Sequence, residues 1–187
     1  MELAIVRKVL PAVAVVLLVW ATVVALAQGT PESNAPKLVV LHATITVSGG
    51  VTFTGAYDDR LPVQTCADVA KGGTGQHDGT GRAMFMVPIP MDNTGGVGGP
   101  VGGGHTFSTD AAAFPYHGPG TYTGSGLSAT QMDADTPPGS QDTHIFAFPT
   151  GIGTLIVKPD ASGSFQFNGL QDPAKVAISG QVAWFCS

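Results

Sequence analysis

Charged residues are scarce in this sequence, and basic residues are almost never clustered. Lys and Arg together number 8 of 187 residues and Asp and Glu number 13, which gives a formal net charge of −5. Arg7 and Lys8 form the one pair of adjacent basic residues. A nucleic-acid-binding surface needs Lys and Arg gathered against the phosphates. The sequence therefore predicts that nucleic acid is not a partner.

The sequence also lacks the composition of a helical protein. The chain holds 26 Gly and 14 Pro, and strong helix formers are too sparse for a helix bundle or a coiled coil. The first 27 residues contain no glycine, and we interpret them as a separate leader segment. The remaining chain of about 160 residues is long enough to bury one core but not two. We expect a single domain without long helices.

Motifs that carry known chemistry are missing. The sequence has no G-x-S-x-G, H-E-x-x-H or phosphate-loop motif. Residues 124–129 fit the loose G-x-G-x-x-A form, but the residues that follow cannot form the helix that would hold a pyrophosphate. Asp133 and Asp135 resemble the start of a calcium loop, yet Pro138 replaces its glycine and His144 its glutamate. The five histidines are scattered, so we predict no cofactor, no metal and no catalytic residue.

The amino-terminal segment has the order of an export signal. Arg7 and Lys8 precede an apolar run over residues 9–26, which ends in the small-residue site Ala25-Leu26-Ala27. A positive start, an apolar middle and a small-residue site are typical of a secretory signal peptide. We predict a signal peptide over residues 1–27 and a Pro-containing linker over residues 28–37. The alternative is an uncleaved membrane anchor, in which case the membrane is a partner.

The two cysteines agree with export to an extracytoplasmic location, either secreted or in the cell envelope. Cys66 and Cys186 both follow the leader, and an even pair in an exported chain predicts a disulfide. Such a bridge would close a loop of about 120 residues and stabilise the fold by about 4–5 kcal/mol in the chain-entropy model. The alternative is two free, buried thiols.

The rest of the chain reads as short strands separated by turns. Alternation of apolar and polar residues predicts strands over residues 41–48, 51–57, 82–89, 143–148, 152–158, 164–167 and 175–186. Two short stretches, residues 65–71 and 110–114, are expected to form one or two helical turns. Seven or eight strands with frequent turns predict an all-β, single-domain antiparallel β-sandwich over residues 38–187, with an Ig-like fold or a small barrel as alternatives.

The last predicted strand has the clearest pattern. Val176, Ile178, Gly180, Val182, Trp184 and Cys186 share one face. We therefore expect Trp184 to lie in the core and Phe185 to point outward, where it could form a stacking surface with Phe146 or Phe148. In the turn over residues 158–163, we expect Gly163 to adopt a positive φ.

Three long loops are the places where we expect function to reside. Residues 95–104 hold seven glycines and are expected to form a flexible hairpin loop, since ordering glycine costs the most backbone entropy. The other two loops cover residues 71–81 and 133–142. The candidate binding residues on or near these loops are His77, Asp78, His117, Asp133, Asp135 and Asp142.

Two stretches resemble small exported β-domain proteins of bacteria. These are Y-H-G-P-G-T-Y over residues 116–122 and the closing I-S-G-Q-V-A-W-F-C strand over residues 178–186. In the proteins that the chain resembles, the first stretch enters a strand and the second ends in a disulfide. The plan is more distantly similar to the mycobacterial 19 kDa lipoprotein antigen family, although no lipid-anchoring cysteine follows the leader. The resemblance implies a cell-envelope setting and no catalytic residues.

These observations predict a non-catalytic envelope or extracellular module that binds or adheres through its Gly- and Asp-rich loops. An envelope polymer, a sugar or another protein is the expected partner. Two alternatives stay open at this point. One is a secreted hydrolase with His and Asp on the same loops, and the other is a purely structural surface protein.

Overall fold

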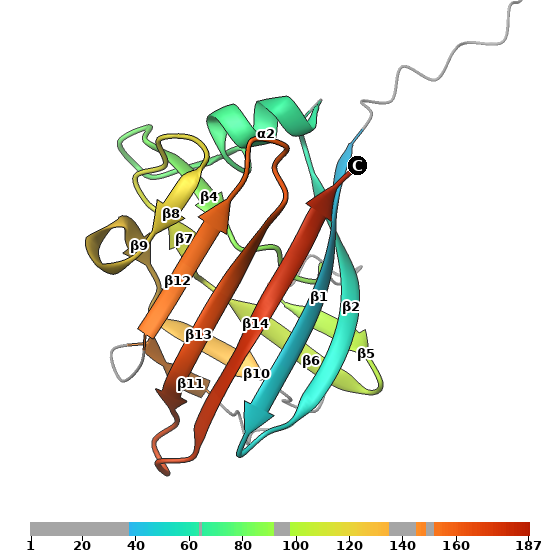
Figure 1. Ribbon diagram of the computed structural model, residues 1–187, viewed down its shortest axis with the longest axis vertical. Coiled ribbons are helices and arrows are strands. Elements are labelled where there is room, and N and C mark those ends of the chain that lie inside the picture. The colour runs from blue at the N-terminus through green and yellow to red at the C-terminus, as the bar shows by residue number, and fades with distance from the viewer. Residues whose placement is uncertain (1–37, 64, 92–97, 135–144, 149–151) are drawn as a thin grey trace, which may run out of the picture. The chain divides into compact units, whose positions relative to one another are not determined.

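The chain folds almost entirely into antiparallel strands (Figure 1). The computed structural model describes residues 38–63, 65–91, 98–134, 145–148 and 152–187. The predicted signal peptide and linker lie outside these residues. The elements are β1 (Val39–Gly49), β2 (Phe53–Leu61), α2 (Cys66–Gly72), β3 (Gln76–His77), β4 (Ala83–Met86), β5 (Gly99–Gly102), β6 (His105–Thr109), β7 (Ala112–Ala113), β8 (Gly120–Tyr122), η1 (Gly124–Gly126), β9 (Leu127–Ser128), β10 (Gln131–Ala134), β11 (Ile145–Ala147), β12 (Ile152–Val157), β13 (Gly163–Gln171) and β14 (Ala177–Cys186).

One large sheet forms most of the domain. Its strand order is β2-β1-β14-β13-β11-β10-β6-β5, while β12 pairs with the first part of β13 and β8 pairs with β12. Figure 1 shows β2, β1, β14, β13 and β12 side by side, with β10, β6 and β5 behind them. The prediction of an all-β antiparallel domain is thus confirmed, and the sheet is closest to the small-barrel alternative.

The two ends of this sheet approach each other at Gly55 on β2 and Val101 on β5. A Cβ atom at Gly55 would lie 2.2 Å from the carbonyl oxygen of Val101, so a side chain at this position would push the strands apart. Inside the curve, the rings of Tyr57 on β2 and Phe107 on β6 lie 6.1 Å apart. The sheet is therefore a nearly closed, barrel-like structure filled by its own side chains.

Segments between β2 and β10 in the sequence form a short helix and a second, smaller sheet. The small sheet has the order β3-β4-β7-β9. Thr65 caps α2 by accepting a hydrogen bond from the N–H of Asp68 at 3.1 Å. The hydroxyl of Tyr116, which is buried, donates to the carbonyl of Ala70 at 2.6 Å and fastens the helix. Within the described ranges, no helix has the length and apolarity needed to cross a bilayer.

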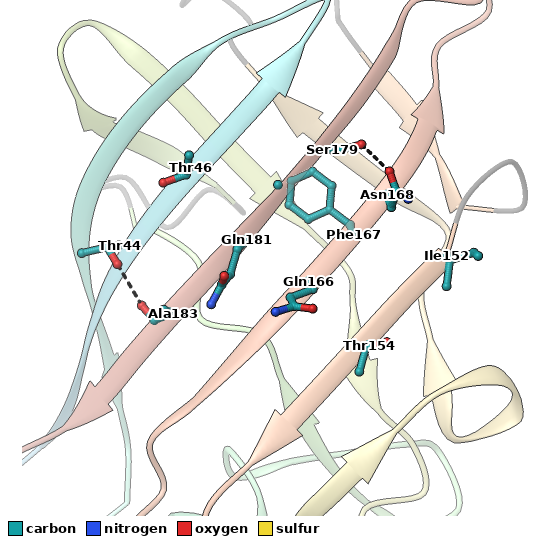
Figure 2. A pocket seen from close by; sticks show the side chains of 11 residues that line it. Thr44, Thr46, Ile152, Thr154, Gln166, Phe167, Asn168, Ser179, Gln181 and Ala183 are labelled. Atoms are coloured by element: carbon teal, nitrogen blue, oxygen red, sulfur yellow. Dashed lines mark hydrogen bonds between the residues drawn. The ribbon is translucent and has the colours of Figure 1, made fainter.

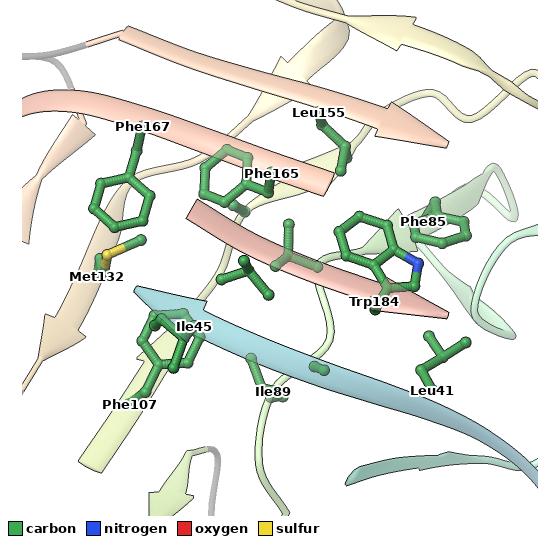
Figure 3. Packing of buried hydrophobic residues seen from close by; sticks show 14 of the residues in the cluster. Leu41, Ile45, Phe85, Ile89, Phe107, Met132, Leu155, Phe165, Phe167 and Trp184 are labelled. Atoms are coloured by element: carbon green, nitrogen blue, oxygen red, sulfur yellow. The ribbon is translucent and has the colours of Figure 1, made fainter. Parts of the chain in front are cut away.

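The core follows the alternation of the strands. On β14, Ile178, Val182 and Trp184 are buried, as the parity of this strand predicts. Figure 3 shows Trp184 beside Phe85, and their ring centroids lie 5.8 Å apart. Phe167 lies near Met132 in the same view. The predicted Cys66–Cys186 disulfide is present and joins the start of α2 to the end of β14.

Three predictions about local backbone structure need correction. Residues 110–114 contain the strand β7 instead of a helical turn, because Ala112 and Ala113 pair with β4 and β9. The glycine-rich stretch at residues 95–104 does contain a hairpin turn, at residues 103–104, but Gly99–Gly102 form the strand β5, since β6 supplies backbone partners that offset the entropic cost of ordering glycine. The rest of that stretch before Gly98 lies outside the described residues.

The third correction concerns the turn between β12 and β13. The positive φ falls on Ala161, at 61°, and not on Gly163. Gly163 instead begins β13, where it pairs with Val157 and faces Trp184. Its missing side chain makes room for the indole ring, which the local turn pattern does not reveal.

Candidate functional site

The structure uses Asp78 to build its own turn. Its carboxylate accepts hydrogen bonds from the N–H and hydroxyl of Thr80 and from the N–H and side chain of Arg82, each at 2.8–2.9 Å. Although local desolvation acts in the opposite direction, these hydrogen bonds hold the pKa of Asp78 well below its usual value. His77 precedes it on β3 and is exposed, with Ala83 as its strand partner. Asp78 thus has a structural explanation.

The other sequence candidates lie on separate elements. The backbone N–H of His117 donates to the hydroxyl of Tyr122 at 3.2 Å in the turn before β8. Asp133 lies on β10 and accepts a hydrogen bond from Ser108 at 3.3 Å. Asp135 and Asp142 lie outside the described residues. Among the residues that are described, no group of three His, Cys, Asp or Glu is arranged to hold a metal. Loop binding by these residues stays a prediction.

A different surface stands out on the outside of the large sheet. The strands β12, β13, β14 and β1 are successive neighbours, and none of them contains Asp, Glu, Lys or Arg. Their outward positions carry Thr, Ser, Gln, Asn and His, together with apolar residues such as Ile152 and Phe185. The exposed face of an antiparallel sheet is ordinarily polar. These four strands therefore supply no formal charge that would attract a polyanion or a polycation.

The centre of this face is one row of side chains that crosses the sheet. Thr46 on β1 pairs with Gln181 on β14, which pairs with Gln166 on β13, which pairs with Thr154 on β12. Figure 2 shows the two glutamine side chains next to each other. Because neighbouring strands are about 4.8 Å apart, the row spans about 14 Å. It presents carboxamide and hydroxyl groups, which both donate and accept hydrogen bonds.

The row lies in an open groove of about 700 Å³, which we call the outer groove. Gly180 and Ala183 are small residues among those that line it. At one end, the hydroxyl of Ser179 donates to Asn168 Oδ1 at 2.6 Å and fixes the amide (Figure 2). Ile152, whose exposed fraction is 72%, adds an apolar patch at this end. The volume is in the range of small-ligand sites.

An aromatic platform adjoins the outer groove. Phe185 on β14 stacks on His42 of β1 with the ring centroids 4.8 Å apart, and Phe185 is 59% exposed. The hollow beside these rings, of about 450 Å³, shares Thr44 and Ala183 with the outer groove. The two surfaces are therefore continuous. Phe185 points outward as predicted, but Phe146 and Phe148 are buried and cannot form the expected exposed surface with it.

His42 also joins two other side chains by hydrogen bonds. Its Nδ1 lies 2.7 Å from Asp58 Oδ1, and its Nε2 lies 2.9 Å from Ser187 Oγ. A carboxylate only accepts hydrogen bonds, so Nδ1 carries the proton in the neutral imidazole and Nε2 accepts from the serine hydroxyl. No sequence motif indicated this arrangement, because Ser187 lies 145 residues from His42 along the chain. Strand pairing places His42 opposite both Asp58 and Phe185.

No protein-family model, curated protein or solved structure matches this chain. The resemblance to small exported β-domain proteins therefore stays a prediction. The functional argument rests on the outer groove and its aromatic end.

Proposed function

We propose that this protein is an exported binding module that holds a neutral, hydroxyl-rich ligand, such as a glycan of the cell envelope, in the outer groove. The observation that carries the proposal is the uncharged polar row formed by Thr46, Gln181, Gln166 and Thr154. We therefore place the binding surface on the sheet, whereas the sequence predicted binding through the loops.

The chemistry of the row suits a sugar better than a charged polymer. Each glutamine amide offers donors and an acceptor to the adjacent hydroxyls of a sugar, and each threonine adds one hydroxyl. A phosphate- or sulfate-bearing polymer would need cations that these four strands do not supply. The exposed ring of Phe185 provides an apolar surface at one end, on which the C–H face of a sugar ring can pack.

The shape of the groove favours an extended ligand. A row of about 14 Å suits a segment of chain more than a single small molecule. A ligand that lies across the sheet would also contact strands that are fixed in relation to one another. Such a preformed site loses little conformational entropy on binding.

The disulfide supports the extracytoplasmic part of the proposal. Disulfides persist in oxidising compartments and are rare in reducing ones, so Cys66–Cys186 is consistent with export. The predicted signal peptide over residues 1–27 supplies the route.

The test is a thermal-shift screen of the full chain against soluble neutral, polyanionic and polycationic oligosaccharides. Neutral chains are expected to raise the melting temperature by mass action, and charged chains to have little effect. The double variant Gln166→Ala/Gln181→Ala should lose the shift, whereas Gln76→Ala, on the exposed strand β3, should keep it. Equal shifts with polyanions, or an unchanged response of the double variant, would contradict the proposal. Self-association through this face, with no response to sugars, would favour a structural surface protein.

A further inference from the structure

Ser187, His42 and Asp58 form a hydrogen-bonded chain that the proposed binding function does not use. The distances are 2.9 Å from Ser187 Oγ to His42 Nε2 and 2.7 Å from His42 Nδ1 to Asp58 Oδ1. Nucleophilic hydroxyl groups in acyl-transfer enzymes are activated by this order of a serine, a base and an orienting carboxylate. We propose that Ser187 is a nucleophile that His42 activates and that takes an acyl group from an ester.

The backbone holds the three side chains in this arrangement. His42 faces Asp58 across the β1–β2 ladder and Phe185 across the β1–β14 ladder. Ser187 is fixed by two backbone hydrogen bonds with Val40, at 2.9 Å and 3.1 Å. The ring of Phe185 stacks on the imidazole and limits its rotation. The geometry thus belongs to paired strands and not to loops.

The chemical step can be written in full. Ser187 Oγ attacks the carbonyl carbon of the ester while its proton passes to His42 Nε2. The bond from that carbon to the alcohol oxygen breaks, and the imidazolium gives the proton to the departing alcohol. Asp58, which accepts from Nδ1–H throughout, stabilises the positive charge that forms on the ring. Water then releases the acyl group as a carboxylic acid, or the acyl group stays on the serine.

Weak oxyanion stabilisation determines which of these outcomes is expected. The N–H of Ser187 donates to the carbonyl of Val40, so it is not available to the oxyanion. The loss of one such donor slows acyl transfer by about 10²–10³-fold. Attack on the ester and attack of water on the acyl-serine both pass through an oxyanion, so both steps are slowed. The good leaving group of an activated ester speeds only the first step, so with such an ester we expect one acylation per chain followed by slow release. The hollow beside Phe185 can accept the acyl group, because Ala43, Ala56 and Trp184 contribute to its lining.

The test is covalent labelling of the full chain. A fluorophosphonate is the first probe, because the serine oxygen replaces fluoride at phosphorus, and 4-nitrophenyl acetate is the second. Tandem mass spectrometry should place the adduct on Ser187 and leave Ser48, an exposed serine of β1, unlabelled. With the ester, one equivalent of nitrophenol should be released in a burst.

Variants separate activation from folding. Ser187→Ala should abolish the adduct, and His42→Ala should slow its formation by about 100-fold or more, the usual contribution of a general base. Imidazole added to His42→Ala should restore part of the rate, which a misfolded protein would not allow. Asp58→Asn should slow labelling by about tenfold or more because the ring tautomer is no longer fixed. His77→Ala is the matched control and should label at the original rate.

Equal labelling of Ser48 and Ser187, or labelling of Ser187 that does not depend on His42, would overturn the proposal. This outcome is independent of the outer groove, because sugar binding is read by thermal shift and acylation by mass. Either function can therefore fail without the other.

Discussion

Gly163 and Trp184 face each other across the β13–β14 ladder, and the indole ring occupies the space that a side chain at residue 163 would need. A Cβ atom there would lie 2.4 Å from Cζ2 of Trp184 and 2.2 Å from the carbonyl oxygen of Ile156. The indole N–H then donates to the carbonyl of Ala161 at 2.8 Å. Burial of this tryptophan thus depends on a glycine and on the turn beside it.

The first prediction concerns this contact. Gly163→Ala should lower the free energy of unfolding by about 2–3 kcal/mol, because neither the indole nor the backbone carbonyl can move without loss of packing. Urea denaturation followed by tryptophan fluorescence measures the change. Gly79→Ala is the control, since a Cβ there meets no atom within 4 Å, and its stability should change by less than about 0.5 kcal/mol. Equal stability of the two variants would contradict the packing argument.

The second prediction concerns the buried carboxyl of Asp59. Burial raises its pKa to about 6, which a hydrogen bond from the N–H of Ile89 partly opposes. The group is 8% exposed, and the nearby hydroxyl of Tyr57 donates to the carbonyl of Pro88. The folded state thus holds a proton that the unfolded chain releases at a lower pH.

The sign of the pH dependence follows from this proton. Between the usual pKa of an aspartate, near 4, and the folded value near 6, the native state binds more protons, so stability should fall as the pH rises. Asp59→Asn should remove this decline and be more stable than the original chain at pH 7.5, by up to about 3 kcal/mol. Denaturation midpoints from pH 4 to pH 8 measure it. A parallel decline in both proteins would show that another group is responsible.

The third prediction concerns the Cys66–Cys186 bridge. It joins residues 120 apart, so its loss should destabilise the fold by about 2–5 kcal/mol. The main cause is that the unfolded chain gains conformational entropy when the bridge no longer restricts it. The double variant Cys66→Ser/Cys186→Ser and the reduced original chain should have similar denaturation midpoints. Reduction of the double variant should cause no further change. A large difference between the two reduced states would point to the serine substitutions themselves.

The fourth prediction concerns the aromatic end of the outer groove. Phe185→Ala should weaken binding of a neutral oligosaccharide by roughly three- to tenfold, since burial of about 30–50 Å² of apolar ring surface against the sugar contributes about 0.7–1.3 kcal/mol. Phe185→Trp should keep or improve affinity. Isothermal titration calorimetry measures both, and Met91→Ala, at another exposed apolar residue, serves as the control. Unchanged affinity of Phe185→Ala would place the sugar elsewhere on the sheet.

Local patterns were sufficient to predict the long strands such as β1 and β14, whereas β6 and β10 lie in segments that the alternation did not assign to strands. Alternation on β1 assigned His42 and Thr44 to the outside, and the parity of β14 placed Trp184 inside and Phe185 outside. These assignments need only the period of two that every strand has. They also brought Cys186 to the inner face, in agreement with the disulfide.

The outer groove could not be found in this way. Its residues come from β1, β12, β13 and β14, and each strand by itself reads as an ordinary polar face. Only the strand order shows that the uncharged faces are neighbours and that Gln166 lies next to Gln181.

The sequence by itself thus determined the class of fold, the inward and outward faces of the main strands, and the pairing of the two cysteines. The tertiary structure decided which strands are neighbours, and therefore the outer groove and the chain of Asp58, His42 and Ser187. The physical reason is the separation along the chain between the residues that interact. A side chain's face depends on the next residues along the chain, whereas strand pairing joins residues such as His42 and Phe185, whose contact no local pattern encodes.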